Sequence, residues 1–177
     1  MTTYADITTA TSLRIERLLP GPIERVWEYL VDGDKRGLWL ASGPLDARTG
    51  GRVGLHFDNS RLTGHADDVP PAKYAAHGNP STLHGDVLAC DPPRLLAFRW
   101  GDAPDASQVR FELQQEGTQV RLTVIHTDAR NRDMMISISG GWHTHLDILA
   151  DRLAERAPKP FWATHATHEA EYERRIP

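Results

Sequence analysis

The longest pattern along the chain is an apolar stripe within residues 133–157. Its apolar side chains recur at steps of three or four residues: Met135, Ile138, Trp142, Leu146, Leu149 and Leu153. This spacing predicts a long amphipathic α-helix, with Asp133 as its N-cap and Pro158 as its stop. The segment MMISIS at its start also alternates as a strand would, but the helical stripe accounts for more residues.

Two adjacent glycines, Gly140 and Gly141, lie inside this predicted helix. Each costs about 1 kcal/mol relative to alanine in a helix interior. We therefore expect that another backbone or a bound molecule comes close at this point, or that the helix is bent.

Earlier in the chain the pattern changes to an alternation of apolar and polar residues, which is typical of half-buried antiparallel strands. The alternating apolar positions are Leu13 and Ile15; Val53, Leu55 and Phe57; Leu96, Phe98 and Trp100; Val109, Phe111 and Leu113; and Val120, Leu122 and Val124. A further, less regular strand is expected over residues 84–90. Turn residues at Asp91-Pro92-Pro93 and Glu116-Gly117 separate the runs. The pattern predicts about six strands.

The remaining segments have other signals. Residues 22–32 predict a short helix after the first strand, with a proline at its first position. Residues 58–82 are rich in Gly, Pro, Ala and Asp without a sustained period, which predicts a mobile lid or a disordered insertion. The tail 158–177 is expected to be helical and to pack on its own domain or on a second subunit, as in a homodimer. Residues 1–11 are expected to be flexible.

Together these elements predict an α+β helix-grip domain over residues 12–157. An antiparallel sheet with one apolar face must cover that face, and the long helix is the only predicted element large enough to do so. A curved antiparallel sheet wrapped around a single helix rarely closes on it completely. We therefore expect a cavity between sheet and helix, lined by inward strand residues and the helix stripe.

Composition narrows the class of protein. The chain has 177 residues, 40% hydrophobic and 25% charged, which fits one globular domain of ordinary core size. A net charge of −4 gives no basic footprint for nucleic acid or an anionic membrane, so neither is expected as a partner. Cys90 is the only cysteine, which excludes an intrachain disulfide. No signal peptide and no apolar run near the roughly 18 residues of a membrane span is present, so we expect a cytoplasmic protein.

Most candidate ligand-binding residues are apolar side chains on the inward phase of a strand or on the helix stripe. Trp39 has no periodic partner and is either part of the core or the mouth of a pocket. With one histidine, the candidates are Trp39, Leu55, Phe57, Phe98, Trp100, Phe111, His126, Trp142 and Leu146. His126 extends the inward row of its strand. It is either a polar group inside the cavity that binds a ligand carbonyl or moves a proton, or a satisfied histidine at the end of a strand.

The other histidines do not predict a metal site. His143 and His145 point about 200° apart on a helix and cannot share an ion, and His143 with Asp147 is expected to be a surface pair. His165 and His168 share a helix face, but spacing fixes no third ligand. We predict no metal, no cofactor and no catalytic residue.

Three segments carry a family resemblance: GPIERVWEYLVDGDKRGLWLASGPLDARTGGRVGLHF, HGDVLACDPPRLLAFRWG and GGWHTHLDILADRL. They resemble the activator of heat-shock-protein-90 ATPase homologue family, part of the START-like superfamily of polyketide cyclases, lipid carriers and the birch-pollen allergen. The resemblance covers about residues 13–153. Its most telling positions are Pro22, Val26 and Trp27; Gly50 and Gly51; Pro92, Pro93, Leu96, Phe98 and Trp100; and Gly141, Trp142 and Leu146.

The resemblance implies the same helix-grip fold, and its framework positions do not fix a function, because the superfamily includes carriers, sensors and enzymes. The expected function is binding of a small apolar molecule between sheet and helix, as a carrier or sensor with a role in stress response. One alternative is a co-chaperone-type regulator with heat-shock protein 90 as partner. Eukaryotic activators of this family carry a separate preceding domain, and only about a dozen residues precede the first strand here, so weak stimulation at best is expected. The other alternative is an enzyme of the polyketide cyclase or aromatase kind, with His126 or an aspartate as acid or base.

Overall fold

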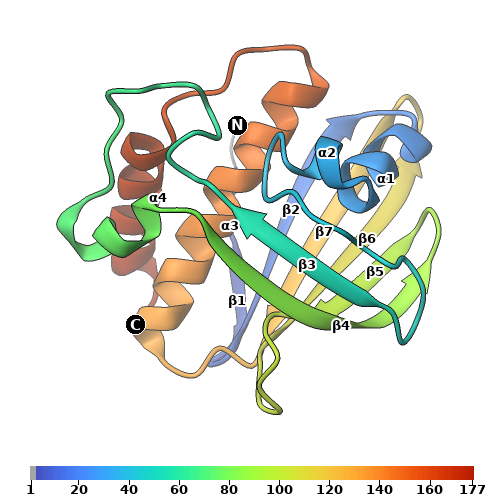
Figure 1. Cartoon of the computed structure of the whole chain (residues 1–177), viewed down its shortest axis with the longest axis horizontal. Helices are drawn as coiled ribbons and strands as arrows, with labels where there is room; N and C mark the ends of the chain where they lie inside the picture. The colour runs from blue at the N-terminus through green and yellow to red at the C-terminus, as the bar shows by residue number, and fades with distance from the viewer. Residues whose placement is uncertain (1–2) are drawn as a thin grey trace.

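The computed structural model describes residues 3–177 and contains one seven-stranded antiparallel sheet in the order β1-β2-β7-β6-β5-β4-β3 (Figure 1). The strands are β1 (Asp6–Thr9), β2 (Ser12–Pro20), β3 (Arg52–Phe57), β4 (Ser81–Asp91), β5 (Leu95–Arg99), β6 (Gln108–Glu116) and β7 (Gln119–Thr127). The helices are α1 (Ile23–Val31), α2 (Gly33–Arg36), the 3-10 segment η1 (Ala72–Gly78), α3 (Arg132–Leu153) and α4 (Phe161–Arg175).

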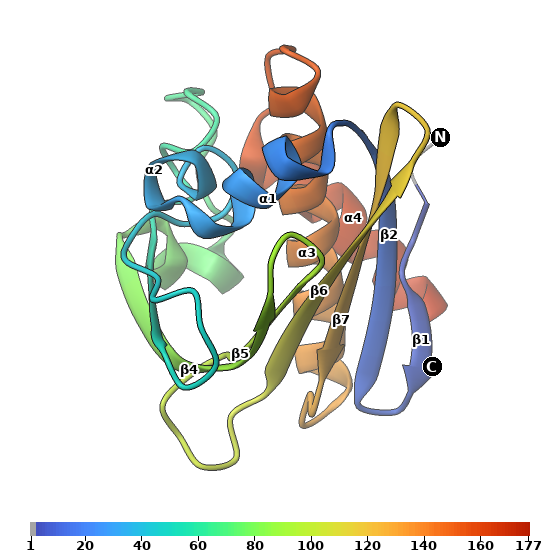
Figure 2. The same cartoon turned by 90° about the vertical axis from the view of Figure 1, so that its right-hand side faces the viewer.

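The long helix α3 lies along the inner side of the curved sheet, as Figure 2 shows. Its stripe residues Trp142, Leu146 and Leu149 are buried, and the inward positions of β2 and β6 alternate in burial as their sequences predict. The apolar faces of sheet and helix therefore cover one another, which confirms the α+β helix-grip prediction.

The two ends of α3 differ from the prediction by a few residues. The N-cap is Asn131, whose side chain accepts a hydrogen bond from the Met134 backbone N–H (2.9 Å), so the expected cap Asp133 lies in the first turn. A carboxylate there is also favourable because it faces the positive end of the helix dipole. The helix ends at Leu153, before Pro158. The MMISIS segment is helical, as the stripe predicted.

The N-terminal segment contains a strand that the sequence pattern did not indicate. Residues 6–9 of the segment expected to be flexible form β1, which pairs with β2 through Ile7 and Leu13. The backbone N–H of Ala5 donates to the Tyr172 hydroxyl (2.8 Å), which ties this edge to α4. The short, mostly polar strand has no apolar alternation, so only its partners reveal it.

The C-terminal tail packs on its own domain. At Gly140 of α3, an added Cβ would lie 3.5 Å from the backbone of Glu169 in α4, so the two helices approach closely there. Phe161 and Trp162, at the start of α4, are buried, and η1 lies beside α4 (Figure 1). The segment 58–82, expected to be a mobile lid or disordered, is instead held against α4 and contains η1.

Within residues 3–177, no helix combines the length and the apolar character that crossing a membrane requires.

Candidate functional site

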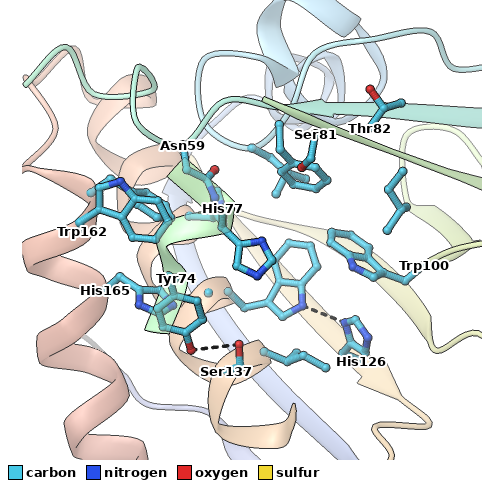
Figure 3. Close-up of a pocket in the computed structure, with 18 residues that line it drawn as sticks. Asn59, Tyr74, His77, Ser81, Thr82, Trp100, His126, Ser137, Trp162 and His165 are labelled. Carbon is cyan, nitrogen blue, oxygen red and sulfur yellow. Dashed lines mark hydrogen bonds between the residues drawn. The ribbon is translucent and has the colours of Figure 1, made fainter. Parts of the chain in front are cut away.

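A cavity of about 360 Å³ lies beside α3, between α4, η1 and the β3–β4 edge of the sheet (Figure 3). Its inner wall includes Trp142 and His126, both buried, while exposed side chains such as His77, Ser81 and Thr82 stand at its rim. The site is therefore a hollow that reaches from the surface to the helix stripe.

Aromatic rings form most of the wall. The Trp100 and Trp142 rings meet edge to face with centroids 5.3 Å apart, and Phe57 lies 5.8 Å from Trp100. On the opposite side, Phe161 and Trp162 meet edge to face at 4.8 Å. Rings in such arrangements offer faces and edges on which a planar apolar molecule can stack.

Four of the predicted binding residues line this cavity: Phe57, Trp100, His126 and Trp142. The other five do not; they are at most 1% exposed and belong to the packed core: Trp39, Leu55, Phe98, Phe111 and Leu146. For Leu55, Phe98, Phe111 and Leu146 the apolar pattern gives the inward face of the strand or helix but not the position along the groove. Trp39 follows α2 and has the core position that was the alternative to the mouth of a pocket.

His126 is held by the protein through both ring nitrogens. Trp142 Nε1 donates to His126 Nδ1 (3.0 Å), and His126 Nε2 lies 2.9 Å from the Ser107 hydroxyl. Because the indole nitrogen can only donate, Nδ1 is unprotonated, and burial lowers the pKa of His126 to about 4. The ring is thus a satisfied neutral histidine whose edge, rather than a free nitrogen, contributes to the wall.

His145 is held through one nitrogen only. Its Nδ1 lies 2.8 Å from the Trp39 carbonyl oxygen, which can only accept, so Nδ1 carries the proton. Burial lowers the pKa of His145 to about 4, which leaves a neutral ring with a lone pair on Nε2. That nitrogen makes no hydrogen bond to any residue among 3–177, and His145 lines the cavity.

His165, on α4, has even fewer partners. It is 5% exposed, lines the cavity, and its Nδ1 is buried without a hydrogen-bond partner among the described residues. Burial lowers its pKa, and its ring packs edge-on against Tyr74 at 5.0 Å. Two neutral imidazoles thus face an otherwise largely aromatic space.

The outer wall is held closed by a polar cluster between η1 and α4. The Tyr74 hydroxyl and Lys73 Nζ both donate to the Glu169 carboxylate, the latter at 2.8 Å, and Tyr74 Oη lies 3.2 Å from Ser137 Oγ (Figure 3). Burial raises the pKa of Tyr74. At Glu169 burial acts against ionisation, but the bonds from Lys73 and Tyr74 outweigh it and lower the pKa.

A second contact fixes the same wall further along α4. The Asp68 carboxylate accepts the backbone N–H groups of Trp162 (2.6 Å) and Ala163 (3.0 Å), the first residues of α4. Because α4 has no side-chain cap of its own, the 58–82 segment supplies one. Folding of this segment and docking of α4 therefore support each other.

The cavity contains no charged side chain among its lining residues in the described part of the chain. Its polar groups are neutral: hydroxyls, an amide and imidazoles. This composition disfavours burial of an ionic group, because a charge inside it would have no counter-ion.

A separate polar cluster lies on the other side of α3. His143 is fully buried and not the surface residue expected; it is 3.8 Å from Asp147, which also accepts from His168 (3.0 Å) and Arg17 (3.2 Å). The rings of His143 and His168 are stacked at 3.8 Å, so their in-plane lone pairs do not converge on one point. With the Arg17 cation already on the carboxylate, this arrangement is a structural network rather than a metal centre.

Comparison with known proteins shows the family. Residues 20–154 match the family described as Activator of Hsp90 ATPase homolog 1-like protein. The chain belongs to this family.

Solved structures of similar proteins agree with this assignment. The protein encoded by gene BPP1335 of Bordetella parapertussis is 44% identical, with a TM-score of 0.80 over 99% of this chain and 94% of that one. CalU16 of Micromonospora echinospora is 23% identical, with a TM-score of 0.67 over 92% and 86% of the two chains. A conserved protein of unknown function, EF2215 of Enterococcus faecalis, is 15% identical with a TM-score of 0.67 over 97% and 88%. The last two show the fold alone. No curated protein matches the chain.

In this family member, the cavity residues that the sequence patterns missed include Tyr74, His145, Phe161, Trp162 and His165. Tyr74 lies in a segment without period, and Phe161, Trp162 and His165 belong to the tail, outside the expected helix-grip domain. The pair Phe161-Trp162 was a usable signal, because two large adjacent aromatics at the start of a polar helix need a surface to cover them. His145 had no such signal, since it lies next to the helix stripe.

Proposed function

We propose that the protein binds a small, neutral, apolar molecule in the cavity beside α3, as a carrier or sensor. The observation that supports this is a hollow of about 360 Å³ whose wall is mainly aromatic and carries no charged side chain. That volume lies within the range typical of small-molecule sites, and apolar walls with a few placed polar groups are their usual composition.

The second glycine of α3 also supports the proposal. A Cβ added at Gly141 would meet nothing within 4 Å, and Gly141 lines the cavity, whereas Gly140 lies against α4. The helix therefore lacks a side chain at the point where the cavity reaches it, although glycine costs about 1 kcal/mol there. A bound molecule that approaches the helix at Gly141 accounts for that cost.

Reversible binding fits the shape of the cavity. Its outer wall consists of η1 and the start of α4, where Tyr74, Phe161 and Trp162 are buried. Its rim residues Ser81 and Thr82 are exposed, so the cavity reaches the surface and a ligand can enter while the sheet stays intact.

Naphthalene is a suitable probe because it is neutral, planar and apolar. We expect saturable one-to-one binding, a raised melting temperature and a change in tryptophan emission for the wild type. Gly141→Leu places a side chain in the cavity and should abolish binding while the protein stays folded. Gly141→Ala, which adds one methyl group to the same position, should keep it. Absence of binding to the wild type, or equal binding by Gly141→Leu, would contradict the proposed function.

A further inference from the structure

Two of the four histidines that line the cavity, the buried His145 and His165, have a ring nitrogen without a hydrogen bond to a described residue, and the proposed apolar binding leaves that nitrogen unexplained. Both rings flank Phe161, with centroids 5.1 Å and 5.9 Å from it, so they lie in the same part of the wall. The Nδ1 of His165 is buried without a partner among the described residues, and such an atom is costly and rare in folded proteins. Either a ligand or water supplies the missing partner.

The donor and acceptor roles follow from the bonds that are already made. His145 Nδ1–H donates a hydrogen bond to the Trp39 carbonyl, so Nε2 can only accept while the ring is neutral. His165 is neutral as well and has one N–H and one lone pair, because no hydrogen bond to a described residue uses either nitrogen. His145 therefore offers a hydrogen-bond acceptor, and His165 can either donate or accept a hydrogen bond.

We propose that the cavity selects a neutral ring compound that carries a hydroxyl or N–H group and donates its proton to His145 Nε2, with His165 as the second polar contact. This inference rests on the proposed function and specifies its ligand class. The donor satisfies the acceptor on His145, and where the donor is a hydroxyl, its oxygen can also accept from the N–H of His165. The apolar rings of the ligand meet Trp100, Trp142 and Trp162.

The same geometry excludes other ligand classes from this position. A carboxylate cannot donate, and no lining cation would balance its charge. An ether offers only an acceptor, which leaves His145 Nε2 unpaired. The discrimination between a hydroxyl and its methyl ether is therefore the property that separates this inference from simple apolar binding.

The test compares 2-naphthol with 2-methoxynaphthalene and naphthalene by calorimetric titration near pH 7.5. We expect the dissociation constant of 2-naphthol to be about 3- to 10-fold lower than that of 2-methoxynaphthalene, the size of one neutral hydrogen bond. His145→Asn should bring that ratio close to one, because its amide nitrogen can replace Nδ1 at the Trp39 carbonyl but nothing replaces Nε2. His165→Leu, which loses no hydrogen bond within the protein, should lower the ratio as well.

His84→Leu is the control, since this histidine is exposed on β4 and does not line the cavity. It should leave the ratio unchanged. If all three compounds bind with equal affinity, or if the ratio survives both His145→Asn and His165→Leu, the inference is overturned and apolar binding stands. If none of the three binds to the wild type, the proposed function and the inference both fail. Should His145→Asn prove unstable, the ratio for His165→Leu decides alone.

Discussion

The groove between α3 and the sheet has a packed half and an open half. The packed half includes Leu146, Phe98 and Phe111, which belong to the hydrophobic core and are essentially inaccessible to solvent. In the open half the same helix presents Ile138 and Gly141 to a cavity. One amphipathic stripe thus serves both purposes. The difference comes from the missing side chain at Gly141 and from what lies opposite, which is sheet in one half and η1 with α4 in the other.

The largest expected effect comes from truncating a side chain in the core, and its size should differ between the two halves. Leu146→Ala should lower the free energy of unfolding by about 2–5 kcal/mol, because it leaves a void in a closed core. Ile138→Ala, on the same helix stripe but facing the cavity, should cost about 1 kcal/mol or less, since its side chain already borders empty space. Urea denaturation of both variants provides the comparison, and equal losses would show that the open half is packed like the rest.

Acid should lower the stability of the fold where the packed and open halves meet. There His126 accepts a hydrogen bond from Trp142. The folded-state pKa of His126, about 4, lies below its unfolded value near 6.5, so the unfolded chain binds the proton more tightly. Its contribution to stability is complete above about pH 6.5 and is lost as the pH falls toward 4. At pH 5 the free energy of unfolding should be lower by about 2 kcal/mol than above pH 6.5.

Urea denaturation at pH 7.5, 6 and 5 measures this loss. His126→Gln should be less stable at pH 7.5 but should show a smaller fall on acidification. An equally steep fall in that variant would assign the pH dependence to other groups, such as His143 and His145.

The sequence predicted the packed half far better than the open half. Alternation in β3, β5, β6 and β7 and the stripe of α3 gave the elements, the inward faces and the helix-grip arrangement, because these depend on local period. The open half depends on Tyr74 in an irregular segment and on His165 in the tail. Neither has a period, and their positions are fixed by contacts between segments far apart in the chain, such as Tyr74 with Glu169.

A smaller effect is expected at the outer wall of the open half. Tyr74→Phe removes the hydroxyl that donates to Glu169 and should cost about 1 kcal/mol, the net value of one hydrogen bond. Hydrogen exchange of residues 72–78 should accelerate, while exchange in β6 and β7 should not change. Tyr29→Phe, whose tyrosine contributes only a backbone carbonyl to Trp39, is the control. Unchanged exchange in η1 would mean that this contact does not hold the wall.

The smallest effect distinguishes the two adjacent glycines. Gly141→Ala should raise stability by about 0.5–1 kcal/mol, because alanine is the better helix former and its methyl meets nothing within 4 Å. Gly140→Ala should be tolerated too, since its methyl would lie 3.5 Å from Glu169 in ordinary contact, but Gly140→Leu should push α4 away. Thermal unfolding of the three variants checks the contrast. Destabilisation by Gly141→Ala would place another group at that position.

The most direct test of the open half is a two-dimensional NMR titration of the tryptophan indole N–H signals with naphthalene. Trp100, Trp142 and Trp162 line the cavity, whereas Trp27 and Trp39 belong to the core and do not line it. We predict saturable shifts at the first three indoles and little change at the other two. Shifts at Trp39 or Trp27 as large as those at Trp142, or no shift at any of the five, would contradict the account.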